Sequence, residues 1–89
     1  MKKFIVYILI SLEKNNWSYV GCTGNLKQRI RDHNQGKTRS TKAYRPLKVI
    51  YTESFCTNDR ARKRELYLKS GIGREYRYKI IKKYYSRIV

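Results

Sequence analysis

The fold depends on an apolar run near the start of the chain, Phe4-Ile5-Val6-Tyr7-Ile8-Leu9-Ile10. A continuous run rich in β-branched side chains is typical of a central strand that is covered on both faces. It is too short to cross a bilayer, which requires about 20 apolar residues. Glu13 and Lys14 end the run and no small-residue cleavage site follows, so we expect a strand and not a secretion signal.

Two further strands are predicted from turn residues and alternation. Asn15-Asn16 favours a turn, and residues 17–21 are typical of the returning strand of a hairpin. Pro46 suits the first position of a later strand. That strand is predicted from the apolar positions that alternate after the proline, namely Leu47, Val49 and Tyr51.

Three helices are predicted from caps and helical spacing. Asn25 can cap a first helix that ends near Gly36. Thr57 and Asn58 can cap a second helix over about residues 59–70. A third helix follows, and its apolar positions recur at helical spacing: Tyr76, Ile80, Ile81, Tyr84, Tyr85 and Ile88.

These elements predict an α+β fold in the order β-β-α-β-α-α, with a three-stranded, mostly antiparallel sheet flanked by helices. Residues 37–45 are basic, rich in hydroxyl side chains and without a period, so we expect a loop there that faces nucleic acid or solvent. The chain has 89 residues, room for one hydrophobic core, and contains no internal repeat or linker. We therefore expect a single domain over residues 1–89.

The charge balance points to an anionic partner. The chain has 22 Lys and Arg against 6 Asp and Glu, a formal net charge of +16 at pH 7. We expect nucleic acid, most of all DNA, bound by a monomer. A membrane is not expected, because no segment forms a basic amphipathic helix with a bulky apolar face. Two cysteines without C-x-x-C spacing are typical of a reducing compartment, so we expect a cytoplasmic protein.

One carboxylate falls on the predicted inner face of the second helix, in a stripe formed by Ala61, Glu65, Leu68 and Ile72. A buried carboxylate is normally paired, so Glu65 could form an ion pair with an arginine. Mg²⁺ is commonly held by one or two carboxylates with water and phosphate oxygens, so Glu65 could instead bind a metal ion. The residues alone leave both interpretations open.

Two more candidates lie on the first helix and two in the predicted hairpin. Arg29 and His33 are i, i+4 neighbours and could grip one phosphate. An ordinary surface arginine and a structural histidine are the alternatives. Tyr7 and Tyr19 would more often be core aromatics. Taken singly, none of these residues indicates a function.

Taken in order along the chain, these residues resemble the GIY-YIG nuclease domain, and specifically its small stand-alone bacterial members. The first triplet is Ile5-Val6-Tyr7 and the second is Tyr19-Val20-Gly21. Arg29 lies ten residues beyond Tyr19, His33 four beyond Arg29, and Glu65 on the later helix. The resemblance covers about residues 3–80, including the predicted metal-binding helix.

The resemblance implies a divalent-metal-dependent endonuclease that hydrolyses phosphodiester bonds of DNA and nicks one strand at a time. Glu65 would hold one Mg²⁺ or Mn²⁺, and Arg29 would stabilise charge in the transition state. A motif tyrosine would be the base, which we assign to Tyr7. His33 and Tyr19 would position the nucleophile and phosphate, and His33 could take a proton from Tyr7. A phenol has a usual pKa near 10, so Tyr7 would be a poor base unless nearby cations, namely Arg29, the metal ion and the field of the +16 protein, favour the phenolate.

The sequence departs from the family pattern in two places. Ile5 stands where the first triplet has Gly, and no Asn follows Asn58, although these nucleases often place an Asn near the scissile phosphate late in the domain. Lys69 or Ser70 could substitute for it. The alternative function is therefore a catalytically weak or inactive GIY-YIG-like module that binds nucleic acid. In either case the expected nucleic-acid contacts are Gly21, Lys27, Arg31, Lys37, Arg39, Lys42 and Lys69.

Overall fold

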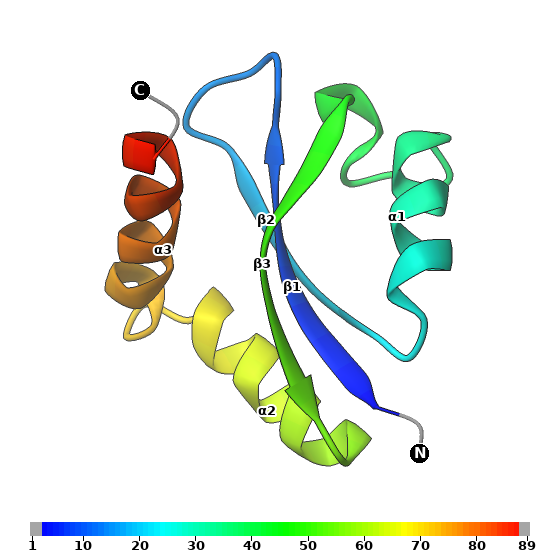
Figure 1. The fold of residues 1–89 in the computed structure, drawn as a ribbon, viewed down its shortest axis with the longest axis vertical. Helices are drawn as coiled ribbons and strands as arrows, with labels where there is room; N and C mark the ends of the chain where they lie inside the picture. The colour runs from blue at the N-terminus through cyan, green and yellow to red at the C-terminus, as the bar shows by residue number, and fades with distance from the viewer. Residues whose placement is uncertain (1–2, 88–89) are drawn as a thin grey trace.

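The computed structural model describes residues 3–87 (Figure 1). Its elements are β1 (Phe4–Ser11), β2 (Ser18–Thr23), α1 (Leu26–Asn34), the 3-10 turn η1 (Lys42–Tyr44), β3 (Leu47–Phe55), α2 (Asn58–Lys69) and α3 (Arg74–Arg87). The predicted α+β architecture and its β-β-α-β-α-α order are confirmed. The sheet order is β2-β1-β3, and both strand pairs are antiparallel.

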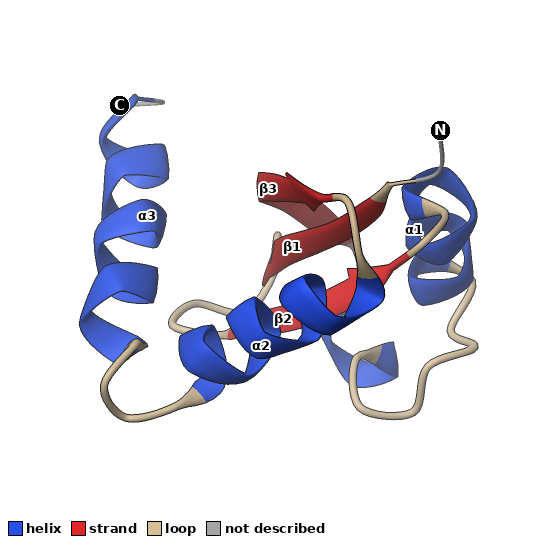
Figure 2. Cartoon of the chain, turned by 90° about the horizontal axis from the view of Figure 1, so that it is seen from below, coloured by secondary structure: helices blue, strands red, loops and turns tan. Residues whose placement is uncertain are grey.

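Strand β1 lies in the centre of the sheet, as its continuous apolar run predicts. Val6 and Ile8 face one side and Tyr7 and Leu9 the other, and all four are fully buried. Helix α1 lies on one side of the sheet, while α2 and α3 lie on the other (Figures 1 and 2). Two small cores therefore sandwich β1.

Helix α2 covers the Val6 face through Ala61 and Leu68, which are fully buried. Helix α3 adds Ile80 and Ile81 to this core. Burying a leucine side chain contributes about 1.5–3 kcal/mol, so these few contacts dominate the attachment of both helices. None of the helices in residues 3–87 is long and apolar enough to cross a membrane.

Three of the apolar positions predicted on α2 and α3 are exposed. Ile72 is 83% exposed because α2 ends at Lys69, and the extended backbone of Ser70 carries the chain off the helix axis. Tyr76 and Tyr85 are 41% and 37% exposed, because they flank the stripe through which α3 contacts the sheet. Ile88 lies outside the described residues.

The helix starts follow their predicted caps. The Asn25 side chain accepts a hydrogen bond from the backbone N–H of Gln28, and Thr57 accepts one from that of Arg60, both at 3.2 Å. Helix α1 ends at Asn34, followed by Gly36 with a φ of +80°, a conformation that glycine adopts without strain. The boundaries of α1 and α2 are thus set by local side-chain chemistry.

Strand β3 begins at Leu47, as predicted, but its alternation does not hold throughout. Ile8 pairs with Tyr51 and Leu9 with Val49, so Ile50 is an extra residue in a β-bulge. One extra residue reverses which face the following side chains take. Val49 therefore packs in the Tyr7 core, while Tyr51 packs in the opposite core.

Candidate active site

The site is built around a contact between Tyr7 and His33. The Tyr7 hydroxyl lies 2.9 Å from Nε2 of His33, although 26 positions separate the two residues in the sequence. Tyr7 points from β1 toward α1, and His33 reaches it from the last turn of α1. Both side chains are fully buried, so this contact lies within the packed interior between β1 and α1.

Gly21 makes room for the Tyr7 phenol. The two residues are direct partners in the β1–β2 ladder, and a Cβ at Gly21 would overlap the Tyr7 hydroxyl and ring. Gly21 is itself buried. We expected Gly21 among the nucleic-acid contacts, but the structure assigns its missing side chain to the close approach of Tyr7.

Tyr19 and Arg29 complete a cluster around this pair. The Tyr19 ring centroid lies 6.4 Å from that of Tyr7 and 5.4 Å from that of His33. Arg29, one turn before His33 on α1, lies close enough to both tyrosines for its interactions with them, above all with Tyr7, to raise the pKa of its guanidinium. Arg29 is only half-buried, so the guanidinium can reach a bound phosphate.

Glu65 approaches the cluster from α2. Its side chain is 13% exposed, and its carboxylate accepts a 3.0 Å hydrogen bond from Nζ of Lys69 one turn later. That Nζ also lies 5.7 Å from the centroid of the Tyr19 ring. The negative charge of Glu65 contributes to raising the pKa of Tyr7, which places the carboxylate within electrostatic reach of the phenol. The structure therefore brings all five predicted site residues together.

A comparison with protein families agrees with this arrangement. The family model for the GIY-YIG catalytic domain matches residues 3–79. The chain belongs to the GIY-YIG family. Membership places it in a superfamily of nucleases, whose substrates are nucleic acids and which generally use divalent metal ions.

The GIY-YIG relatives include small bacterial proteins. UPF0213 protein YazA of Bacillus subtilis is 38% identical over 64 residues, which cover 71% of this chain and 64% of YazA. UPF0213 protein SH2523 of Staphylococcus haemolyticus is 38% identical over 82 residues, 91% of this chain and 96% of that protein. The solution NMR structure of UPF0213 protein BH0048 from Bacillus halodurans has a TM-score of 0.53 at 27% identity, and covers 88% of this chain and 84% of that one.

Burial sets the ionisation of Tyr7 in the metal-free protein and raises its pKa from 10.0 to about 12. Arg29 acts in the opposite direction and is outweighed, and the negative charges of Tyr19 and Glu65 add to the rise. The condition that cations favour the phenolate is not met by Arg29 alone. The GIY-YIG tyrosine of this chain is therefore a neutral phenol at pH 7 in the metal-free protein.

His33 is held in its neutral form. Burial and the positive charge of Arg29 lower its pKa, and the carboxylate of Asp32 opposes them more weakly. A neutral imidazole keeps one ring nitrogen free to accept a proton. The buried pair therefore combines a phenol that holds its proton with a neighbour that can take it.

The donor set fits one hard divalent cation. Within residues 3–87 no group of three or more His, Cys, Asp or Glu side chains gathers, so a closed site of protein ligands is not formed there. Mg²⁺ typically keeps several waters and uses one or two carboxylates with substrate phosphates. Glu65 supplies such a carboxylate, and Lys69 is the cation that a metal ion would have to displace.

The ion-pair interpretation of Glu65 is partly realised, but with a different partner. We considered an arginine, whereas Glu65 pairs with Lys69. The neighbouring Arg64 instead binds Glu53 through several hydrogen bonds between 3.1 and 3.2 Å. Arg64, one of the three arginines of α2, is thus occupied by Glu53 of β3.

Of the two substitutes for the late asparagine, only Lys69 lies at the site. Ser70 donates a 2.6 Å hydrogen bond to the carbonyl of Tyr67 and accepts one from the N–H of Gly73. Its hydroxyl is therefore used to end α2. Lys69 remains beside Glu65 and Tyr19.

The predicted phosphate-binding side chains lie on α1 and the segment after it. The exposed members of this set are Lys27, Arg31, Lys37, Arg39 and Lys42. Lys37 is paired with Asp32, at 3.5 Å. Because α1 carries Arg29 and His33 as well, these cations stand near the candidate site, and their contacts with nucleic acid stay a prediction.

Sequence reasoning missed Thr41. We expected residues 37–45 to form an exposed loop, but Thr41 is fully buried and Lys42–Tyr44 forms a 3-10 turn. The Thr41 Oγ1 lies 2.9 Å from Nδ1 of His33. The hydroxyl-rich composition of the segment was the only signal in the sequence.

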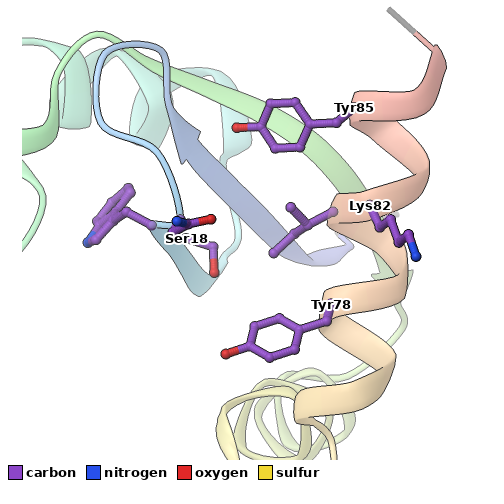
Figure 3. Close-up of a pocket in the computed structure, with 7 residues that line it drawn as sticks. Ser18, Tyr78, Lys82 and Tyr85 are labelled. Atoms are coloured by element: carbon purple, nitrogen blue, oxygen red, sulfur yellow. The ribbon is translucent and has the colours of Figure 1, made fainter. Parts of the chain in front are cut away.

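A separate pocket of about 490 Å³ lies between α3 and the β1–β2 turn, away from this cluster. Figure 3 shows Tyr78 and Tyr85 extending from α3 toward Ser18, with Lys82 pointing away. None of the five site residues lines this pocket. The chemistry therefore belongs to the polar cluster and not to this cavity.

Proposed function

We propose that the protein is a divalent-metal-dependent endonuclease that hydrolyses phosphodiester bonds of DNA and introduces nicks. The observation that carries this proposal is the buried hydrogen bond between Tyr7 and His33, next to Arg29 and Glu65. Each side chain has the chemistry that phosphodiester hydrolysis requires at such a site. The net charge of +16 favours a polyanionic substrate.

Tyr7 and His33 act as a proton relay. At pH 7 a phenol with a pKa of about 12 is ionised in only about one molecule in 10⁵, so a preformed phenolate is not the base. The attacking water gives its proton to the Tyr7 oxygen while the phenol proton passes to Nε2 of His33. The new bond joins the water oxygen to phosphorus, and the bond between phosphorus and the 3′ oxygen breaks. The 3′ oxygen leaves with the electron pair of that bond and takes a proton from solvent, and His33 later returns its extra proton to solvent.

Arg29 stabilises the charge that gathers on the phosphoryl oxygens, through planar, multi-donor hydrogen bonds that lysine reproduces poorly. Its interactions with the hydroxyl groups of Tyr7 and Tyr19 keep the guanidinium near them before substrate binds. Glu65 would hold the Mg²⁺ or Mn²⁺ ion, which supplies Lewis-acid stabilisation of the phosphoryl and leaving oxygens when bound. Lys69 is positioned to contact the phosphate once it is released from Glu65.

Plasmid nicking tests this proposal with a matched pair of variants. Wild type with Mg²⁺ or Mn²⁺ should convert supercoiled DNA to open circles, and Glu65→Ala should abolish the conversion. Asp59→Ala is the control, because Asp59 also pairs with the lysine four positions later on α2 but is 78% exposed and away from the cluster. Cleavage that survives Glu65→Ala, or that Asp59→Ala removes equally, would contradict the assignment.

A second candidate function is nucleic-acid binding without turnover. It is favoured by one observation, the lack of any Asn after Asn58 together with the use of Ser70 in the end of α2. Binding would then persist without metal and weaken with salt, by a slope of about −0.9 per phosphate neutralised on duplex DNA. Tight binding without product under Mg²⁺ or Mn²⁺ would support this function over the first.

A further inference from the structure

We propose that Thr41 is a positioning residue, which fixes the tautomer of His33 so that the lone pair of Nε2 faces the Tyr7 hydroxyl. Its catalytic consequence rests on the proposed nuclease function, whereas the tautomer itself does not. Thr41 comes from the segment between α1 and β3, which the sequence presents as an exposed basic loop. No part of the GIY-YIG pattern quoted above includes it.

The hydroxyl of Thr41 has two partners and one proton. Its Oγ1 lies 2.9 Å from Nδ1 of His33 and donates a hydrogen bond to the carbonyl of Thr38, at 3.3 Å. A carbonyl only accepts, so the single hydroxyl proton is directed to Thr38. Nδ1 of His33 must then be the donor to Oγ1.

A neutral imidazole carries one N–H, so a proton on Nδ1 leaves Nε2 as the acceptor. Nε2 is the atom 2.9 Å from the Tyr7 hydroxyl, which therefore donates to it. The chain of donors runs from Tyr7 to His33, from His33 to Thr41, and from Thr41 to Thr38. The phenol proton already points along the path that the relay requires.

The surroundings of Tyr7, at the other end of this series of hydrogen bonds, also favour the Nδ1–H tautomer of His33. The Arg29 guanidinium lies near the Tyr7 hydroxyl and can only donate, so it offers no acceptor for the phenol proton. In the opposite tautomer, Nε2–H would donate to the Tyr7 oxygen, and within residues 3–87 no hydrogen-bond acceptor of the phenol other than His33 could take its proton. The Nδ1–H tautomer gives each donor in the series from Tyr7 through His33 and Thr41 to Thr38 an acceptor, as buried groups require.

The local backbone explains why this hydroxyl is available. Thr41 occupies the N-cap position of the 3-10 turn Lys42–Tyr44, where a threonine commonly accepts from a backbone N–H, yet its side chain makes no such bond. The N–H groups of Thr41 and Lys42 bond to the Thr38 carbonyl instead, at 3.2 and 3.0 Å. This turn buries Thr41 completely and directs its hydroxyl to His33.

Thr41 takes no proton in the reaction. When His33 receives the Tyr7 proton on Nε2, Nδ1–H continues to donate to Oγ1, so the ring keeps its orientation in both charge states. The groups that set the charge of His33 are Arg29 and Asp32, both on α1. Thr41 controls which nitrogen faces Tyr7.

The protein offers a direct measurement, because His33 is its only histidine. Nitrogen-15 NMR of the ring distinguishes the two tautomers by their shifts and by their couplings to the ring carbon-bound protons. We expect wild type and Thr41→Ser to show the Nδ1–H tautomer at neutral pH. Thr41→Val has the same shape without the hydroxyl, and should show an increased share of the Nε2–H tautomer. A wild-type ring in the Nε2–H form, or a Thr41→Val ring unchanged from wild type, would overturn the proposal.

Nicking kinetics test the consequence. Thr41→Val should lower kcat about tenfold, the factor that corresponds to one neutral hydrogen bond, with KM unchanged and with activity restored in Thr41→Ser. A loss that Thr41→Ser does not restore would mean a packing role and would contradict the proposal. If wild type cleaves no DNA, the nuclease function fails, while the NMR measurement still decides the role of Thr41.

Discussion

The Tyr7 phenol lies over the Cα of Gly21, in the space where any other residue would place its Cβ. We expect Gly21→Ala to displace the phenol from His33 and to cost about 1–3 kcal/mol of unfolding free energy, as overpacking of a core does. Urea unfolding and plasmid nicking check the two effects. Gly71→Ala is the control, because a Cβ there meets nothing within 4 Å. Equal stability of the two variants would contradict this account of Gly21.

Tyr7→Phe keeps the ring and removes the hydroxyl, so we expect loss of nicking with the fold retained. The variant also isolates the effect of Tyr7 on alkaline stability. Burial raises the pKa of Tyr7 to about 12, so its contribution is complete below pH 10 and is lost as the pH rises from 10 to 12. A two-unit shift corresponds to about 2 to 3 kcal/mol.

The measurement is urea unfolding of the metal-free protein at pH values from 8 to 12. The difference in unfolding free energy between wild type and Tyr7→Phe should shrink across the upper part of this range. Comparison with the variant is needed because Tyr51 also has a raised pKa, through burial and its hydrogen bond to Glu53. Exposed Tyr78, changed to Phe, should leave the profile of wild type unchanged.

His33 predicts a second pH dependence, of opposite direction. Its folded pKa is lowered by burial and Arg29, so the unfolded chain binds a proton more readily than the native state. The stabilisation is complete above the unfolded pKa near 6.5 and is lost as the pH falls from there through the folded pKa. Urea unfolding from pH 7.5 down to pH 5 should show this loss in wild type and a flatter profile in His33→Gln. Parallel profiles would show that His33 is not held neutral.

Much of the fold could be predicted because its signals are local. The apolar run 4–10 has one stable arrangement, a strand covered on both faces, and the caps at Asn25 and Thr57 need only the next turn of backbone. The bulge at Ile50 could not be predicted, because the register of β3 depends on its pairing with β1. Ile72 continued the helical period in sequence, but the extended Ser70 ended the helix first.

The identity of the candidate site residues could be predicted from the sequence, but their ionisation and the role of Thr41 could not. Residue type and order pointed to Tyr7, His33 and Glu65 through the family resemblance. The ionisation of these side chains depends on burial, which the sequence does not show, and burial raises the pKa of Tyr7 in the metal-free protein. Thr41 was missed because its role arises from a turn that no periodic pattern marks.

Lys69 supplies the last prediction, because it holds the Glu65 carboxylate that we assign to the metal ion. Lys69→Gln removes a cation that competes with Mg²⁺ or Mn²⁺, so metal binding should tighten. A partly exposed ion pair contributes about 0.2–1 kcal/mol, which corresponds to a Kd for Mn²⁺ that is lower by a factor of about 1.4 to 5 in calorimetric titration without DNA. The control is Lys63→Gln, which removes the equivalent i, i+4 pair with Asp59 on the same helix. A Kd for Mn²⁺ that rises or stays the same in Lys69→Gln would contradict this prediction, because Lys69 would then not compete with a metal ion for Glu65.

The affinity of the same variant for DNA should change in the opposite direction. DNA binding should weaken in Lys69→Gln, because the ammonium group of Lys69 is predicted to contact phosphate. Tighter metal binding together with weaker DNA binding would separate the two roles of Lys69.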